Sequence, residues 1–299
     1  MLTTISNFPS LLRPGNAAVF EDYNIYPQWW FPVYARKKSD KAVEYELQMQ
    51  SLGLAQLKSE SGSIAMSSFQ ERYKTAYVMQ YYGIGFKITR SAIKDNLYHS
   101  EFGMNNQAMR NSLDTLKNMN AAAPFNLAFT SFTTADGKPL ASTTHPTAIG
   151  VNATTFDVNV DFSEASVEAA ITAIKGWTNQ AGLPINMMPQ RVLVPQALAF
   201  QATRIFRSEF TPGSPNNAVN ALVYDKYLPH GPLVSQFLTN PKAWFILTDE
   251  PNGFKYYMRE PLEIDFIQDP TVMSVTTVAL ERYAFGCSDP LAVFGVKGA

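Results

Sequence analysis

Hydrophobic and polar residues alternate strictly over two neighbouring stretches, 43–50 and 73–82. Period-two alternation of this length is typical of β-strands with two unlike faces. The segment between them, Lys58 to Ser63, is polar and rich in Ser and Gly, as expected for a turn region. The pattern predicts one long antiparallel hairpin, with arms of about 11 residues that span roughly 35 Å at ~3.3 Å per residue. An isolated two-stranded hairpin is marginal in water, so we expect it to lie on a neighbouring copy of the chain.

The first 35 residues contain four prolines, which argue against a long helix because proline fixes φ and lacks an N–H donor. The cluster from Tyr26 to Pro32 is strongly aromatic, so we expect an extended arm that docks through aromatic side chains. An ordinary segment packed on its own domain remains the alternative. Apolar and aromatic side chains of the arm and the hairpin are the predicted contacts between subunits: Trp29, Trp30, Tyr45, Leu47, Met49, Tyr73, Tyr77 and Met79.

From Phe102 to Ala123 the apolar spacing changes to the helical period, which predicts a helix of about 20 residues, roughly 30 Å long. Its apolar stripe is Phe102, Met109, Leu113, Leu116, Met119 and Ala123, with Lys117 on the polar side. Residues 83–88 lead into this helical region, and Pro124 marks a kink or an end. A second helix begins after Ser163, an N-cap residue, and Gly182 supplies a stop. A third begins with Pro195 at its first position.

The remaining hydrophobic segments are predicted to form strands. They cover residues 191–194, 243–247, 254–259, 272–285 and 291–296. The segment Glu250-Pro-Asn-Gly253 contains Asn-Gly, which favours a hairpin between the strands on either side of it. Helices and antiparallel strands are therefore mixed, and the predicted fold class is α+β.

Charged residues make up only 16% of the chain, below the ~25% of ordinary soluble domains, and the net charge is −1. This balance argues against a dedicated nucleic-acid binder, whose affinity comes mainly from basic residues. The single cysteine excludes an intrachain disulfide and fits a reducing compartment. The sequence contains no 18-residue apolar span and no secretory signal, so we expect no membrane contact.

No catalytic, cofactor-binding or metal-binding residues are predicted. The three histidines are not spaced as metal ligands, and no nucleophile elbow is present. We expect His145 to order its loop through hydrogen bonds and Cys287 to lie in the core. The acidic residues between positions 260 and 269 fit a solvated edge better than a catalytic acid/base pair. They are Glu260, Glu263, Asp265 and Asp269. The sequence therefore predicts that the protein is not an enzyme.

Several segments, in a fixed order after the hairpin and the long helix, carry a resemblance to a known family. They are Asp136-Gly-x-x-Leu140, His145-Pro146, Gly150-x-Asn152, Gly182-x-Pro-Ile185, Pro189-x-x-Val-Leu-Val-Pro195, Thr239-Asn-Pro-Lys-Ala-Trp-Phe245, and Glu281-Arg-Tyr-Ala-Phe-Gly286 with Asp289. Together they resemble the major capsid protein of tailed double-stranded-DNA phages, particularly the Mu-type major head subunit branch.

The resemblance implies the major capsid fold of tailed phages and a division of the chain. It assigns residues 1–35 to an N-arm, 36–82 to an extended E-loop hairpin, and 83–160 to a P-domain with the spine helix and the following loop. It assigns 161–262 to an A-domain and 263–299 to P-domain strands that return towards the A-domain. The implied function is a structural protein that self-assembles into hexamers and pentamers, forming the icosahedral head around phage DNA.

The resemblance also implies partners. The subunit is expected to form homo-oligomers in the virion, to assemble in the host cytoplasm, and to enclose double-stranded DNA without sequence-specific binding. Because the chain begins almost at the arm, we expect a separate scaffolding protein, together with a portal. Some relatives join an E-loop lysine to a C-terminal asparagine; Lys58 could serve on one side, but residues 261–299 contain no asparagine, so no covalent crosslink is expected.

Two alternatives remain open. The first is an encapsulin-like cellular shell that holds cargo. The proline-rich arm, which offers no amphipathic N-terminal helix for cargo docking, favours the phage protein. The second is a monomeric binding domain or a hydrolase, which the size of the purified protein distinguishes from large assemblies.

Overall fold

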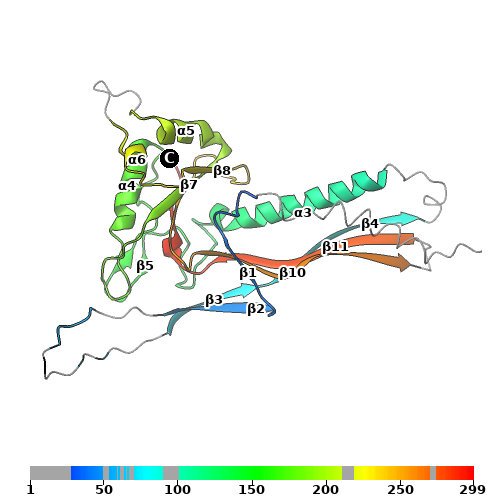
Figure 1. Ribbon diagram of the computed structural model, residues 1–299, viewed down its shortest axis with the longest axis horizontal. Coiled ribbons are helices and arrows are strands. Elements are labelled where there is room, and N and C mark those ends of the chain that lie inside the picture. Colours follow the sequence, from blue (N-terminus) through cyan, green and yellow to red (C-terminus); the bar gives the residue numbers. More distant parts are fainter. Residues whose placement is uncertain are drawn as a thin grey trace, which may run out of the picture.

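The structure, a computed structural model, has a compact lobe, an elongated lobe and a hairpin that projects beside them (Figure 1). The elongated lobe contains a long sheet and the longest helix, and the compact lobe contains a second sheet with shorter helices. The described residues are 28–49, 54–58, 60, 64, 66, 71–89, 101–210, 219–269 and 274–299, with backbone only for 101–106, 266, 268 and 269.

The long sheet is built on two antiparallel strands, β10 (Phe254–Asp269) and β11 (Ser274–Cys287). Strand β1 (Ala35–Lys38) adds to β10 in parallel, and β4 (Gln80–Thr89) adds to β11 antiparallel, which gives the order β1-β10-β11-β4. The ladder between β10 and β11 is irregular from Met258 to Glu263. Proline cannot donate to a ladder, so Pro261 explains why the irregularity lies there.

Strand β4 corrects one prediction from the sequence. The period-two pattern was assigned to one hairpin arm up to Tyr82, and residues 83–88 were expected to lead into a helix. In the structure the hairpin ladder ends at Val78, and the chain then joins the long sheet as β4. Alternation of residue types identifies a strand but does not show which strand it pairs with. Here the pairing partner changes from β2 to β11 after Met79.

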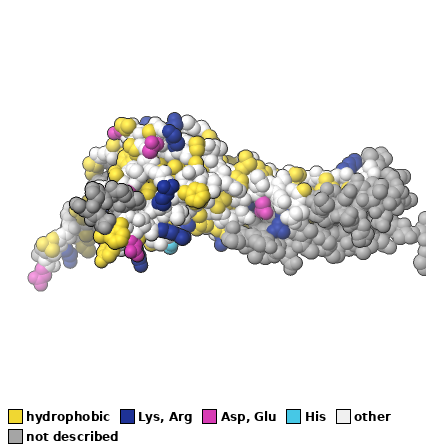
Figure 2. Space-filling view, turned by 90° about the horizontal axis from the view of Figure 1, so that it is seen from above, with side chains coloured by type: hydrophobic (Ala, Val, Ile, Leu, Met, Phe, Trp, Pro, Cys, Tyr) yellow, Lys and Arg dark blue, Asp and Glu magenta, His cyan; other side chains and the backbone are white. Residues whose placement is uncertain are grey.

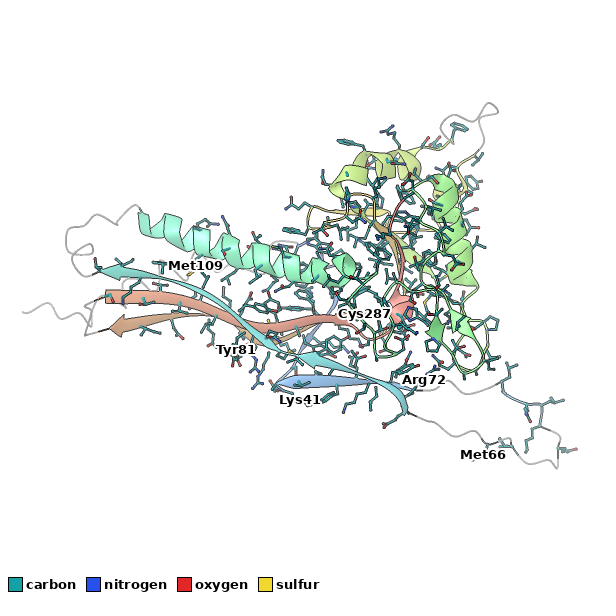
Figure 3. The ribbon with its side chains drawn as sticks, turned by 180° about the vertical axis from the view of Figure 1, so that it is seen from behind. Lys41, Met66, Arg72, Tyr81, Met109 and Cys287 are labelled. Carbon is teal, nitrogen blue, oxygen red and sulfur yellow. The ribbon has the colours of Figure 1, made fainter. Side chains whose placement is uncertain are left out.

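Helix α3 (Glu101–Asn126) runs along the long sheet, and Met109 and Leu113 pack with Ala279 of β11 (Figures 1 and 3). The helix was predicted at 102–123 and continues past Pro124. Its buried stripe also differs from the prediction. Leu116 and Met119 are exposed, whereas Lys117 is buried. The predicted polar position therefore faces the sheet, where Lys117 meets Glu281.

The compact lobe holds the second sheet, in the order β12-β9-β7-β8, with both parallel and antiparallel pairs. Its strands are β7 (Pro189–Pro195), β8 (Pro232–Ser235), β9 (Trp244–Thr248) and β12 (Val293–Val296). Its helices are α4 (Glu164–Lys175), α5 (Ala199–Arg207) and α6 (Ala221–Tyr224), with single 3-10 turns η2 (Gln196–Leu198) and η3 (Pro290–Ala292). A short pair, β5 (His145–Pro146) and β6 (Val151–Asn152), lies in the loop after α3. Helices and strands are mixed as predicted, which confirms the α+β class.

The start of α4 confirms the N-cap predicted at Ser163. The Ser163 hydroxyl accepts from the N–H of Ser166, and the Ser166 hydroxyl accepts from the N–H of Ser163, a reciprocal capping box. The helix ends at Gly176, whereas the predicted stop at Gly182 lies in a later turn with φ +75°. Pro195 is the residue before the turn η2 rather than the first residue of a helix.

The Asn-Gly signal at residues 252–253 was misleading. Strands β9 and β10 flank this turn but do not pair, because β9 joins the compact sheet and β10 joins the long sheet. Gly253 is needed for another reason. A Cβ placed there would lie 2.7 Å from Cβ of Ala292, so only glycine fits the contact between this turn and η3.

Two large apolar clusters support the lobes. One lies where the lobes meet and combines Trp30 and Tyr34 with Phe125 of α3 and Phe254 of β10. The other fills the compact lobe between α4, α5 and the second sheet. The residues just before β1 are therefore part of the subunit's own core, which brings the root of the hairpin to a fixed place.

Candidate interaction surface

The projecting hairpin is the candidate functional site, and its two faces are chemically different. It pairs β2 (Val43–Met49) with β3 (Glu71–Val78) in antiparallel register. One face carries Glu44, Glu46 and Gln48 opposite Tyr77, Thr75 and Tyr73. The other carries Val43, Tyr45 and Leu47 opposite Val78, Ala76 and Lys74.

The apolar face points to solvent. Tyr45, Leu47 and Met49 are 53%, 50% and 49% exposed, and Val78 on the partner strand is 53% exposed. The Lys74 ammonium lies 3.8 Å from the centroid of the Tyr45 ring, so this face also contains a cation–π pair. Side chains beyond the strands, such as Leu57 and Met66, are also exposed, and Figure 3 shows Met66 far from both lobes.

The polar face of the hairpin lies on the subunit itself, with Glu46 at the centre of the contact. Its carboxylate accepts hydrogen bonds from Lys255 and Tyr257 of β10 and from Ser288. The side chain of Lys255 is only 2% exposed, so this is an ion pair largely removed from water. Burial by itself would raise the pKa of Glu46, but the hydrogen bonds from Lys255, Ser288 and Tyr257 and the charge of Lys255 lower it to about 2.

Further hydrogen bonds continue this contact along the hairpin. Gln48 Nε2 donates to Asp289 Oδ2 at 2.6 Å, and Arg72 Nη2 donates to the carbonyl of Pro146 at 2.8 Å. Tyr77 and Ser288 join their hydroxyls at 2.6 Å. Figure 3 shows Arg72 at the end of β3 that lies beside the compact lobe. We call Glu46, Gln48, Arg72 and Tyr77, with the groups they meet, the seat of the hairpin.

The eight predicted contact residues divide into three groups in the structure. Trp30, Tyr77 and Met79 are 2%, 3% and 3% exposed in the subunit alone, because they pack in its own core or against β10 and β11. Tyr45, Leu47 and Met49 are exposed. Trp29 and Tyr73 are partly buried, and Trp29 packs edge-on against Phe125. The exposed three remain the predicted contacts to a second subunit.

The expectation that the hairpin needs a surface to lie on is met in part by the subunit itself. The sequence alone did not indicate that Glu46, Lys255, Ser288 and Asp289 meet, because they come together from distant parts of the chain. One signal was available: Lys255 lies within the otherwise apolar run Phe254-Lys-Tyr-Tyr-Met258, and a lysine in a buried strand needs an anionic partner.

The loop after α3 is ordered by His145, as predicted. The ring atom Nδ1 lies 2.6 Å from Asp136 Oδ2, and Nε2 lies 3.0 Å from Thr154 Oγ1 and 3.3 Å from the carbonyl of Leu140. Burial raises the pKa of Asp136, but hydrogen bonds from His145, Thr134 and the Lys138 N–H lower it overall. His145 is 3% exposed, which fits a structural role.

The described residues offer little for chemistry. Among them, no group of three or more His, Cys, Asp or Glu side chains could hold a metal ion. Cys287 is buried, as predicted, and burial raises the pKa of its thiol well above the ordinary value. Of the helices in the described ranges, none is both long and apolar enough to cross a lipid bilayer.

Comparison with known proteins identifies the family of the chain. A family model described as "Phage capsid protein" matches residues 72–296, about three quarters of the chain. No curated protein sequence matches it.

Solved structures share its fold at low sequence identity. A virus-like particle from Pyrococcus furiosus matches with a TM-score of 0.55 at 8% identity, over 95% of this chain and 98% of that one. A structure from Mycobacterium phage Cain matches with 0.57 at 13%, over 93% and 94%. The capsid of cyanophage P-SCSP1u matches with 0.58 at 10%, over 89% and 86%.

Proposed function

Because the chain belongs to the phage capsid protein family, it is a structural subunit of a capsid shell and a component of the virion, and we propose that the hairpin joins each subunit to the next. In this proposal the subunits form hexamers and pentamers of the icosahedral head of a tailed phage. The assignment to the Mu-type branch stays a prediction, as does the division into N-arm, E-loop, P-domain and A-domain.

The observation that carries the proposal is the exposed apolar face of the hairpin. Tyr45, Leu47, Met49 and Val78 are each about half exposed on one side of a ribbon whose other side is already used by the seat. A contiguous apolar surface of this kind marks an interaction site. If the ribbon loses a few hundred Å² of apolar surface to a neighbour, the gross gain is on the order of 10 kcal/mol at ~25 cal/mol per Å².

The proposed partners follow from the family and the charge. We propose that the shell assembles in the host cytoplasm with a separate scaffolding protein and a portal, and that it encloses double-stranded DNA. The net charge of −1 supports containment of DNA with little electrostatic attraction to its phosphates. On the face shown in Figure 2, Lys and Arg lie among acidic and apolar side chains of the described part rather than in one continuous stripe. We also propose that the protein performs no catalysis.

The encapsulin-like alternative has less support. The likeness to the virus-like particle from Pyrococcus furiosus concerns the fold alone, at 8% identity. The family match, in contrast, extends over residues 72–296 and is to phage capsid proteins.

The test is assembly of the purified protein with and without scaffold, followed by size-exclusion chromatography and electron microscopy. We expect capsomers or closed shells. A stable monomer of 33.3 kDa under all these conditions would contradict the proposal. A cargo protein enclosed in shells made in uninfected cells would favour the alternative.

A further inference from the structure

The root of the hairpin is fixed in the subunit at both strands. Before β2, the N–H of Ser39 donates to the carbonyl of Met258 at 3.0 Å. At the end of β3 and just after it, Tyr77 and Met79 are buried against Tyr257 and Ala284. A two-stranded ribbon held at its root can still pivot about that root. Its direction is then set by contacts farther along, which the structure places at Glu46, Gln48 and Arg72.

Among these three contacts, Glu46 is the one whose partner is a buried cation. Lys255 is 2% exposed, and its other hydrogen bond in the structure goes to the neutral Asn252 Oδ1 at 3.3 Å. A buried ammonium without an anion is strongly unfavourable. If Glu46 loses its charge, Lys255 keeps only the neutral Asn252 and the charge of Glu250, with which it makes no ion pair, so water becomes its best new partner. Water reaches it when the ribbon lifts from β10.

We propose that Glu46 is a positioning residue for assembly: its bonds to Lys255, Tyr257 and Ser288 set the direction in which the hairpin leaves the subunit. They thereby set where Tyr45, Leu47 and Met49 meet the next subunit. The inference rests on the proposed role of the hairpin in shell assembly. It adds that the subunit presents the ribbon at a defined angle before any neighbour is present.

The chain offers a matched control for Glu46. Glu44 lies on the same strand and the same face, two residues away. Its hydrogen-bond partners, Ser39 Oγ at 3.0 Å and Lys41 Nζ at 3.4 Å, belong to the adjoining turn rather than to β10. Glu46→Gln and Glu44→Gln therefore remove the same charge from the same face. Each also removes the partner of a more exposed lysine, Lys37 at 3.2 Å from Glu46 and Lys41 at 3.4 Å from Glu44. The variants therefore differ in whether the buried Lys255 loses its ion pair.

The first measurement is amide hydrogen exchange of the free subunit. For Glu46→Gln we expect exchange at least tenfold faster in β2 and β3, with β11 and α3 unchanged and the subunit still folded. For Glu44→Gln we expect the wild-type pattern. In the double variant Glu46→Gln, Lys255→Met, the ammonium is gone and methionine fills its place, so we expect protection of the ribbon to return.

The second measurement is the size distribution of assembled particles in electron micrographs. Wild type, Glu44→Gln and the double variant should give one size, whereas Glu46→Gln should give open or irregular particles. A purely stabilising role would lower the melting temperature without changing particle geometry.

Two results would overturn the inference. One is unchanged exchange in β2 and β3 of Glu46→Gln; the other is normal particles despite lost protection. If Glu46→Gln does not fold, the double variant Glu46→Gln, Lys255→Met provides the test. Irregular particles from this variant, with β2 and β3 still protected from exchange, would overturn the inference. If even the wild type makes no particles, the proposed function fails. The exchange comparison between Glu46→Gln and Glu44→Gln still tests whether Glu46 holds the hairpin on the subunit.

Discussion

Lys117 Nζ lies 2.6 Å from Glu281 Oε2, and each of these side chains is only 3% exposed. The pair connects the middle of α3 to β11, with the ammonium also 5.1 Å from the centroid of the Tyr283 ring. It is a fixed point between the long helix and the long sheet. An apolar contact could slide along the groove between them, but a paired charge requires one alignment.

Breaking this pair should destabilise the subunit. We expect Lys117→Met or Glu281→Gln to lower the free energy of unfolding by about 3–5 kcal/mol, since each leaves one charge buried without its partner. The double variant should lose less than the sum of the two single losses. Urea unfolding of the free subunit measures all three. Strict additivity would show that the two side chains are not coupled; Lys41→Met, at an exposed pair, is the control and should change little.

The apolar face of the hairpin should matter for assembly and not for folding. Replacing Tyr45, Leu47 and Met49 by serine removes exposed apolar surface, so the melting temperature of the free subunit should stay close to wild type. Shell yield should fall at least tenfold, by about 1.4 kcal/mol per factor of ten in association. Val158→Ser, at a residue 71% exposed in the compact lobe, is the control. A normal shell yield from the triple variant would contradict the proposal that these three side chains contact the next subunit.

The seat should weaken in acid over a defined range. The pKa of Glu46 is about 2 in the folded subunit, below its ordinary value of 4.5. A lowered pKa stabilises the fold fully above the ordinary value, and that contribution is lost as the pH falls towards 2. The stability difference between wild type and Glu46→Gln should therefore be constant above pH 5 and shrink between pH 4.5 and 2. A constant difference down to pH 2 would mean that Glu46 is not paired as described.

His145 should contribute stability through its hydrogen bonds. We expect His145→Ala to lower the free energy of unfolding by about 1–3 kcal/mol, the cost of leaving buried partners such as Asp136 unsatisfied. His230→Ala changes an exposed histidine and serves as the control. Both are measured by thermal or urea unfolding. A His145→Ala subunit as stable as wild type would show that the loop is ordered by other contacts.

Binding to duplex DNA should be weak and only slightly dependent on salt. Each neutralised phosphate adds about 0.9 to the slope of log affinity against log salt. With a net charge of −1, we expect a slope of about 2 or less for free capsomers in fluorescence anisotropy. A slope that corresponds to six or more phosphates per subunit would contradict the proposal that the shell contains DNA without gripping it.

Local patterns predicted the elements well wherever local forces decide them. The alternation at residues 43–49 indicated both the strand and its two faces, and Ser163 indicated the start of α4. The pattern could not tell which hairpin face is covered. The polar face is covered because Glu46 meets Lys255, 209 positions away in sequence, and no local signal reports such a distant partner.

Contacts between residues distant in sequence also explain the other differences between the predicted and the observed structure. On α3 the apolar stripe pointed to Leu116 and Met119, but Lys117 is buried because Glu281 lies opposite it on β11. At the 252–253 turn, Asn-Gly is typical of a hairpin, yet glycine is required there by the approach of Ala292. Both are tertiary effects that override a local preference.

The turn at Gly253 and the segment at Ser288 are two places where the chain passes between the lobes, and they touch: the N–H of Ser288 donates to the carbonyl of Gly253 at 3.3 Å. The hairpin is tied to this same spot, through Ser288 to Glu46 and through Asp289 to Gln48. Mechanically, the ribbon is attached at the junction of the two lobes rather than to one lobe alone. A load applied to the ribbon would therefore reach both lobes through this junction.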